Sequence, residues 1–154
     1  MSDEDLYQGG LSMKETPTQL SLVKRVEVRF SEVDSIRAVW HGNYVKYLED
    51  AREEWGRKYG LGYMTIFENG YYAPVYQLSM QYLQMATVND VLLVNIVYCK
   101  TIGGKIKFQY EIRRESDDAL VLKAESLQLF TTREGEFSPY APDFYVKWQQ
   151  EHNI

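Results

Sequence analysis

The residues with the greatest chemical potential lie in one short loop between two regular patterns. Residues 31–42 have no clear period and contain Asp34, Ser35 and His41. A carboxylate in such a loop can attack a carbonyl carbon or deprotonate a water molecule. Asp34 followed by Ser35 is also typical of an ordinary turn, in which the side chain bonds its own backbone. His41 could assist a leaving group, orient water, or only hold the loop.

A helix is predicted directly after this loop. Apolar residues recur there at three- and four-residue steps, which indicates one buried helix face: Tyr44, Tyr47, Leu48, Ala51, Trp55 and Tyr59. We expect Asn43 to cap this helix, and Gly60 with Gly62 to end it. Unpaired N–H groups at a helix N-terminus can stabilise the negative charge on a carbonyl oxygen under attack. The predicted donors are the backbone N–H groups of His41 and Gly42.

Strand patterns surround the loop and the helix. Residues 22–30 alternate in hydropathy and predict a half-buried strand. The other predicted elements follow the helix: strands over 71–85, 91–100, 105–114 and 120–132, and a short helix ending near residue 150. Tight turns between the later strands predict antiparallel neighbours. Residues 1–21 are polar and predict a flexible tail, which leaves 22–154 as a single domain.

Composition fits one globular domain of 154 residues. The net charge of −5 argues against a nucleic-acid footprint. The single cysteine, Cys99, cannot form an intrachain disulfide, and we expect it to be a buried small hydrophobe. No apolar run approaches the ~20 residues of a membrane span, and the acidic start does not resemble a secretory signal. We therefore expect a cytoplasmic protein without a membrane partner.

Motifs for several cofactor and nucleophile sites are absent from the sequence. It contains no P-loop, no G-x-G-x-x-G, no G-x-S-x-G and no C-x-x-C. The two histidines, His41 and His152, lie far apart in the chain, which disfavours a zinc site. We expect neither a metal nor a cofactor.

A spaced pattern links the loop to the helix. It consists of Asp34, six residues, His41, two residues, Tyr44, and the helical run Glu49-Asp50-Ala51-Arg52. This pattern resembles the 4-hydroxybenzoyl-CoA thioesterase group of hot-dog proteins, which includes short-chain acyl-CoA hydrolases. The strand, helix and four-strand order is similar over about residues 22–132. Arg37 departs from the pattern, since the group usually has glycine there, so the loop path or the substrate entrance is expected to differ.

The resemblance implies an α+β hot-dog fold, a curled antiparallel sheet wrapped around one long helix. It implies hydrolysis of an acyl-CoA or acyl-carrier-protein thioester, with coenzyme A present only as part of the substrate. Asp34 would be the catalytic carboxylate, as nucleophile or general base, with His41 assisting and Tyr44 contacting substrate. Two alternatives stay open. One is a hot-dog dehydratase or hydratase, whose Asp and His spacing this loop lacks; the other is a non-catalytic acyl-thioester-binding module.

Other polar residues have two interpretations each. Basic residues gather near the predicted hairpin ends: Lys100, Lys105, Lys107, Arg113 and Arg114. They form either a solvated rim or a docking surface for coenzyme A phosphates, with Lys105 and Arg113 as contacts. Glu49, on the polar side of the helix, is expected to be solvated or salt-bridged rather than catalytic. Three tyrosines after the helix line either an acyl pocket or the core: Tyr63, Tyr71 and Tyr72.

Assembly follows from the predicted layers. One amphipathic helix can cover only one face of a sheet. The remaining face and an exposed strand edge predict a homodimer or a homotetramer. The 13 tyrosines suit subunit interfaces and ligand clefts.

Overall fold

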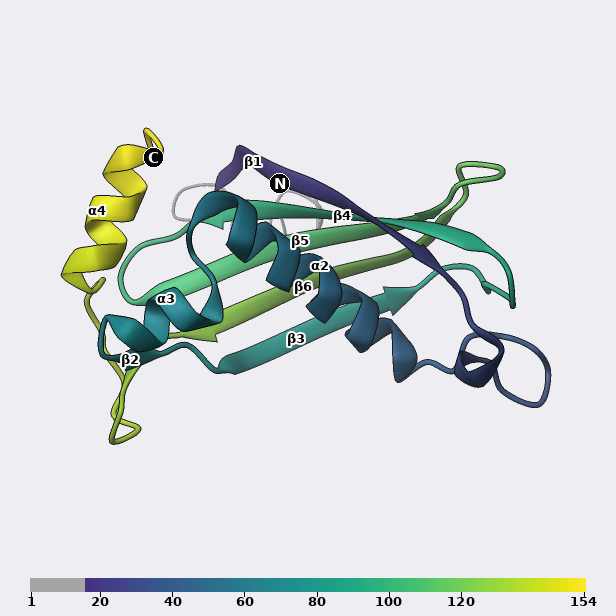
Figure 1. Cartoon of the computed structure of the whole chain (residues 1–154), viewed down its shortest axis with the longest axis horizontal. Helices are drawn as coiled ribbons and strands as arrows, with labels where there is room; N and C mark the ends of the chain where they lie inside the picture. Colours follow the sequence, from purple (N-terminus) through teal and green to yellow (C-terminus); the bar gives the residue numbers. More distant parts are fainter. Residues whose placement is uncertain (1–15) are drawn as a thin grey trace, which may run out of the picture.

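The computed structural model describes residues 16–154, which form one main sheet and its helices (Figure 1). The helical segments are η1 (Phe30–Glu32), α2 (Asn43–Tyr59), α3 (Tyr63–Glu68) and α4 (Asp143–Glu151). The main-sheet strands are β1 (Thr16–Glu27), β3 (Val75–Tyr82), β4 (Val91–Lys100), β5 (Lys105–Arg114) and β6 (Leu120–Leu129). Their order is β1-β4-β5-β6-β3, with every neighbouring pair antiparallel. A separate two-stranded sheet joins β2 (Tyr71–Tyr72) to β7 (Thr131–Thr132).

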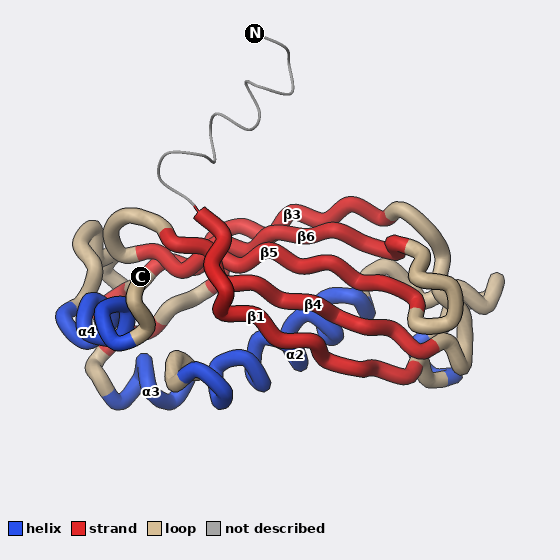
Figure 2. The backbone as a smooth tube through the Cα atoms, turned by 90° about the horizontal axis from the view of Figure 1, so that it is seen from above, coloured by secondary structure: helices blue, strands red, loops and turns tan. Residues whose placement is uncertain are grey.

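Helix α2 lies along one face of the main sheet, and the core fills the space between them (Figures 1 and 2). The predicted apolar face of the helix is buried, with Ala51 and Trp55 both at 0% exposure. Strands β4 and β5 present alternate side chains to this core, as period-two strands must. The indole Nε1 of Trp55 donates a hydrogen bond to the Leu20 carbonyl at 2.9 Å. The predicted α+β architecture, a sheet curled around one long helix, is confirmed.

The first strand begins earlier than predicted. β1 starts at Thr16, which pairs with Lys100, so residues 16–21 belong to the sheet and the predicted tail boundary at residue 21 is wrong. The register shifts between Pro17 and Ser21, and that irregularity removes the alternation from which a strand is recognised. The rest of the predicted tail, residues 1–15, lies outside the described residues.

Two predicted strands are interrupted. The strand expected over 71–85 divides into β2 and β3, because Pro74 lacks the N–H group that a continuous ladder needs. The strand expected over 120–132 divides at Phe130, whose N–H bonds the Gly104 carbonyl at 2.9 Å. The short helix α3 was not predicted. The C-terminal helix α4 was predicted and runs to Glu151.

Strand β3 forms an open edge of the main sheet. It pairs with β6 on one side, and no other strand of residues 16–154 pairs with its second side. Helix α2 packs on β1 and β4, at the opposite side of the sheet. Several large apolar side chains of β3 are therefore exposed: Val75 (51%), Tyr76 (65%), Leu78 (38%) and Tyr82 (50%).

Candidate active site

Asp34 lies in a tight loop that its own side chain helps to shape. Its Oδ1 accepts hydrogen bonds from the N–H groups of Ile36 at 2.9 Å and Ala38 at 3.2 Å. Its backbone N–H donates to the Ala38 carbonyl at 2.8 Å, beside a bridge between Val33 and Val39. The second oxygen, Oδ2, accepts no hydrogen bond from residues 16–154, and the residue is exposed. One oxygen therefore serves the turn while the other is open to a ligand.

Arg37 adopts a backbone conformation that is typical of glycine. Its φ of 64° lies in the left-handed region, which glycine occupies readily and other residues occupy at a cost. Its N–H still donates to the Asp34 carbonyl at 2.9 Å. The expected difference in the loop path or the substrate entrance stays a prediction.

The N-terminus of α2 presents unpaired donors next to this loop. Gly42 is the N-cap residue and makes no side-chain capping bond, so the prediction of Asn43 as the cap is wrong. Asn43 is the first helical residue, and its side-chain amide donates to the Glu32 carbonyl at 2.8 Å. The N–H groups of His41 and Gly42 have no acceptor among the described residues. Together with the helix dipole, these two donors favour a negatively charged oxygen at this end of α2.

Glu32 ties the loop to the helix, a role that the sequence patterns did not reveal. Its carboxylate accepts the Arg29 N–H at 2.8 Å and the Tyr47 hydroxyl at 3.1 Å. Burial, together with this carboxylate, raises the pKa of Tyr47, so the phenol stays a donor. The Glu32 carbonyl also accepts the Trp40 N–H at 3.0 Å. The available signal was the position of Glu32 three residues after Arg29, at the start of a short helix.

His41 and Tyr44 differ in what they offer a ligand. His41 is exposed, and its ring lies 4.9 Å from Trp40 and 6.4 Å from Tyr82, centroid to centroid. The Tyr82 hydroxyl of β3 donates to the His41 carbonyl at 3.0 Å and so fixes the backbone at this point. Tyr44 is only 3% exposed, and its ring packs against Tyr47 and Tyr82. Its placement is that of a core residue, and its predicted contact with substrate stays a prediction.

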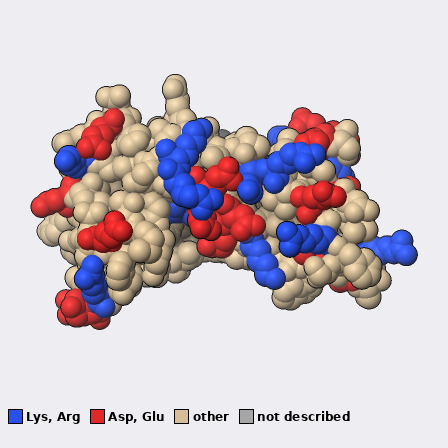
Figure 3. Space-filling view, viewed as in Figure 1, with Lys and Arg blue, Asp and Glu red and all other residues tan. Residues whose placement is uncertain are grey.

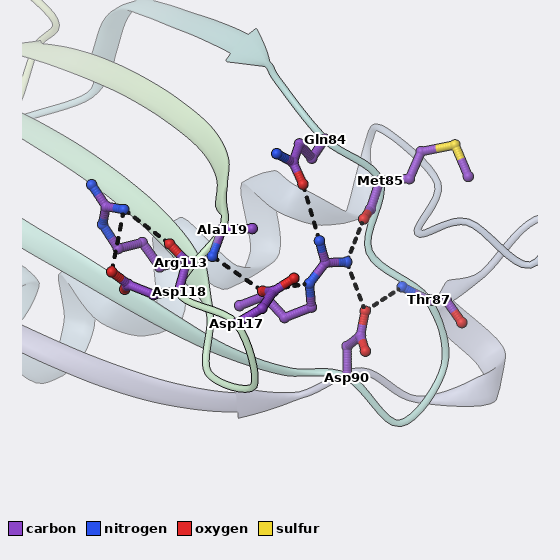
Figure 4. A network of polar contacts seen from close by, with 9 residues as sticks. Gln84, Met85, Thr87, Asp90, Arg113, Asp117, Asp118 and Ala119 are labelled. Carbon is purple, nitrogen blue, oxygen red and sulfur yellow. Dashed lines mark hydrogen bonds and ion pairs between the residues drawn. The ribbon is translucent and has the colours of Figure 1, made fainter.

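Arg114 holds the segment 84–90, which forms hydrogen bonds with the Asp34 loop (Figure 4). It donates to the Met85 carbonyl at 3.1 Å, to the Gln84 side chain at 3.0 Å and to Asp117 at 3.0 Å. It also lies 3.7 Å from Asp90, whose carboxylate accepts the Thr87 N–H at 2.9 Å. Thr87 in turn forms a bridge with Ala38, and the Val39 N–H donates to the Ala86 carbonyl at 2.8 Å. The network therefore connects β5 to the Asp34 loop.

The predicted basic docking surface is not one surface. Lys105 and Arg113 lie at opposite ends of β5, about 27 Å apart at the rise of an antiparallel strand. Arg113 lies at the end of the sheet that carries the loop, where it bonds the Asp118 carbonyl and neighbours Glu111. Positive and negative side chains are intermixed over the face that carries α2 (Figure 3). The two basic residues therefore cannot contact the same phosphate group, and their contact with the phosphates of coenzyme A stays a prediction.

A cavity of about 1080 Å³ lies between α2, α3 and β3. Tyr63 and Tyr72 line this cavity, which favours the pocket interpretation for these two residues. Glu49 also lines it. Tyr71 instead packs on Phe130 and Phe144. Within residues 16–154, no group of three or more His, Cys, Asp or Glu side chains is placed to hold a metal ion. No helix of the same residues has the length and apolarity to cross a membrane.

An antiparallel sheet curled around a single long helix, with a polar loop leading into that helix, defines the hot-dog class of α+β proteins. The chain belongs to the thioesterase-like superfamily, whose family model matches residues 28–149.

Named relatives of this chain are bacterial. YbgC of Haemophilus influenzae, an acyl-CoA thioesterase, is 26% identical over 128 residues, covering 82% of this chain and 92% of its own length. YneP of Bacillus subtilis, provisionally assigned as an acyl-CoA thioesterase, is 24% identical over 131 residues, covering 82% and 94%.

Solved structures show the same fold. The 1,4-dihydroxy-2-naphthoyl-CoA thioesterase Slr0204 of Synechocystis superposes with a TM-score of 0.75 at 18% identity, covering 87% of this chain and 98% of that chain. The 4-hydroxybenzoyl-CoA thioesterase of Pseudomonas sp. strain CBS-3 has a TM-score of 0.73 at 22% identity, covering 83% and 98%.

Proposed function

We propose that the protein hydrolyses acyl-CoA thioesters to a carboxylic acid and free coenzyme A, with Asp34 as the catalytic carboxylate. One observation carries the assignment of the site: Asp34 keeps an open oxygen beside a helix N-terminus whose His41 and Gly42 N–H groups have no acceptor among the described residues. Membership of the thioesterase-like superfamily and the names of the bacterial relatives support the substrate class.

The reaction adds water across the acyl carbon–sulfur bond. The thioester carbonyl oxygen accepts hydrogen bonds from the His41 and Gly42 N–H groups, which stabilise the charge that develops there. As a general base, Asp34 takes a proton from water while the water oxygen bonds to the carbonyl carbon. The carbon–sulfur bond then breaks and the thiolate takes up the proton. As a nucleophile, Asp34 would instead form a mixed anhydride that water hydrolyses.

The leaving group decides which basic residues matter. Arg113 lies at the loop end of the sheet and is the better placed of the two predicted phosphate contacts. Arg113→Ala should raise KM about threefold or more and change kcat little, because phosphate contacts bind ground and transition states alike. Lys105→Ala is the matched control at the far end of the same strand. An equal rise in KM for both variants, or for neither, would remove Arg113 from the docking site. A carrier-protein thioester remains a second predicted substrate form.

Assembly completes this proposal. A second copy of the chain is the natural cover for the open β3 edge, because unpaired backbone groups and exposed apolar side chains together favour strand pairing. We expect a homodimer or homotetramer in sedimentation at micromolar concentration, and a monomer there would contradict this expectation. A cytoplasmic location is also proposed, supported by the single cysteine.

The direct test is a screen of the purified protein against acyl-CoAs of varied chain length, with aromatic acyl groups included. Release of free thiol would be followed with a thiol reagent. We expect turnover of at least one acyl-CoA, and its loss in Asp34→Asn. Tight binding of acyl-CoA without thiol release from any substrate would instead identify a non-catalytic binding module.

A further inference from the structure

The cavity beside α2 is long enough to hold an extended acyl group. Its lining begins at Val45, near the helix N-terminus, and continues to Gly60 at the C-terminal end. That stretch spans roughly 22 Å at the rise of an α-helix. Apolar side chains form much of its wall, among them Leu48, Ile66 and Leu78. Asp34, His41 and Gly42 do not line the cavity, but its near end at Val45 lies three residues along α2 from Gly42, so the acyl chain of a thioester held at the helix N-terminus can extend into it.

Five charged side chains also line the cavity, and Arg52 is the one among them that is not exposed, the others being Glu49, Asp50, Glu53 and Arg57. Arg52 lies about two and a half turns from the start of α2. Its Nε donates to the Gln128 side chain at 3.1 Å, and its Nη1 donates to the Leu61 carbonyl at 3.3 Å. Its guanidinium carbon lies 4.7 Å from the Phe108 ring centroid and 5.6 Å from that of Trp55. Burial lowers the pKa of this guanidinium below its ordinary value. Arg52 is thus a desolvated cation held by aromatic rings and two hydrogen bonds.

The third nitrogen of Arg52 has no protein partner. Nη2 makes no hydrogen bond, and no carboxylate of residues 16–154 lies within 4.0 Å of the guanidinium. Nη2 is not one of the fully buried side-chain atoms that lack a hydrogen bond, so it keeps some contact with solvent. Because Arg52 lines the cavity, an acceptor on a ligand bound there would lie within reach of Nη2. A partly buried donor without a protein partner gains from an acceptor on a ligand, and guanidinium groups form their strongest bonds with oxygen acceptors.

The neighbouring polar groups do not satisfy this donor. Tyr110 and Ser126, on the sheet side of the cavity, bond each other at 3.0 Å, and burial raises the pKa of Tyr110 to about 12. Glu49 and Glu53 line the cavity but are exposed, and Glu53 pairs with Arg57 at 2.9 Å. The unsatisfied donor of Arg52 is therefore available to a ligand.

We propose that Arg52 selects acyl groups that carry a hydrogen-bond-accepting oxygen remote from the thioester, such as a terminal hydroxyl or carboxylate. This inference rests on the thioester hydrolysis proposed above. The separation sets the length of the acyl group, because Arg52 lies about 14 Å along the helix axis from Asn43. A medium-length chain with its oxygen at the far end matches that reach, and a hydrocarbon chain would leave the donor unpaired.

The experiment compares acyl groups of equal length on the complete chain. Non-hydrolysable thioether analogues of decanoyl-, ω-hydroxydecanoyl- and ω-carboxynonanoyl-CoA would be titrated by calorimetry, and kcat/KM would be measured for the corresponding thioesters. We expect at least one oxygenated analogue to bind about tenfold or more tightly than the decanoyl analogue, since a site with a buried donor rejects a ligand that leaves it unpaired. The hydroxyl and carboxylate arms distinguish a neutral acceptor from an anion.

Two variants assign the preference to Arg52. Arg52→Met keeps an unbranched apolar stem but removes the guanidinium and its donors, and should bring the binding ratio to within about twofold of unity. Arg25→Met is the matched control, because Arg25 is exposed on β1 and pairs with Glu115 outside the cavity. It should keep the wild-type ratio.

The outcomes separate the two proposals. Equal binding of the hydrocarbon and oxygenated analogues by the wild-type protein would overturn the role of Arg52, whatever the variants do. A preference that survives in folded Arg52→Met would overturn it as well. Selective binding of an oxygenated analogue, without hydrolysis of its thioester, would uphold the role of Arg52 and contradict the proposed hydrolysis.

Discussion

The two ends of α2 are built in different ways. At the N-terminus, backbone hydrogen bonds and a few polar side chains hold an exposed loop, and Phe30, Ile36 and Trp40 are at least half exposed. At the C-terminal half of α2, aromatic rings pack into a buried cluster. Trp55 lies 4.7 Å from Phe108, 5.8 Å from Tyr98 and 5.9 Å from Trp148, measured between ring centroids.

This difference indicates that the N-terminal end of α2 serves ligand binding and that the C-terminal half serves stability. The N-terminal end keeps donors and a carboxylate oxygen open, which a tightly packed core could not do without leaving them unpaired. The aromatic end supplies the burial that holds the helix on the sheet. Substitutions at the first end should therefore change chemistry more than stability, and substitutions at the second should do the reverse.

The largest effect on stability is expected from Trp55→Ala. The side chain is fully buried and donates to the Leu20 carbonyl, so its removal should lower the free energy of unfolding by about 3–5 kcal/mol. Denaturant unfolding would measure this change. Trp40→Ala is the control at the opposite end, where the ring is 51% exposed, and it should cost less than about 1 kcal/mol. Similar losses from both variants would break the proposed contrast.

The largest effect on chemistry is expected from Asp34→Asn. Asparagine keeps an oxygen to accept the Ile36 and Ala38 N–H groups but places an amide where Oδ2 was, so the loop should persist. We expect kcat to fall by ~10² or more, with the substrate Kd nearly unchanged. His41→Ala should cost less, because its backbone N–H remains. Turnover close to wild type in folded Asp34→Asn would move attention to Glu49, which lines the cavity.

Arg114→Met is expected to have an intermediate effect on both catalysis and stability. Loss of its bonds to Met85 and Gln84 should loosen the segment that supports the Asp34 loop. We expect kcat to fall roughly fivefold and the free energy of unfolding to fall by about 1–2 kcal/mol. Steady-state kinetics and denaturant unfolding on the same preparation would separate the two losses. Unaltered kcat together with lower stability would show that the network does not position the loop.

The smallest effect is expected from Arg37→Gly. Glycine adopts the observed φ of 64° without strain, so stability should rise by about 0.5–1 kcal/mol. Catalysis should change little, because the backbone path stays the same. A loss of stability would mean that the Arg37 side chain makes a contribution larger than the relief of strain.

The sequence predicts the elements whose signal is local. The periodic face of α2, the tight turn that joins β4 to β5, and the helix end at Gly60 were all recognisable, and Gly60 indeed caps the helix with φ at 72°. The Asp34 loop was recognisable from residue types and spacing. The roles of Glu32 and Arg114 were not, because each depends on partners brought together by the fold. The open donor of Arg52 depends in the same way on the cavity around it, and the start of β1 was hidden by an irregular register.

Gly56 lies where a side chain would change the position of Arg52, and so the proposed selectivity for acyl groups. A Cβ atom there would lie 2.7 Å from the Gly62 backbone and 3.0 Å from Arg52 Nη1, so any larger residue must displace the guanidinium or the turn after the helix. Substitution of Gly56 would therefore alter which acyl groups are accepted although this residue offers no side chain to a ligand. Among descendants of this chain, substrate range could diverge through residue 56 while Asp34, His41 and Arg52 all stay the same.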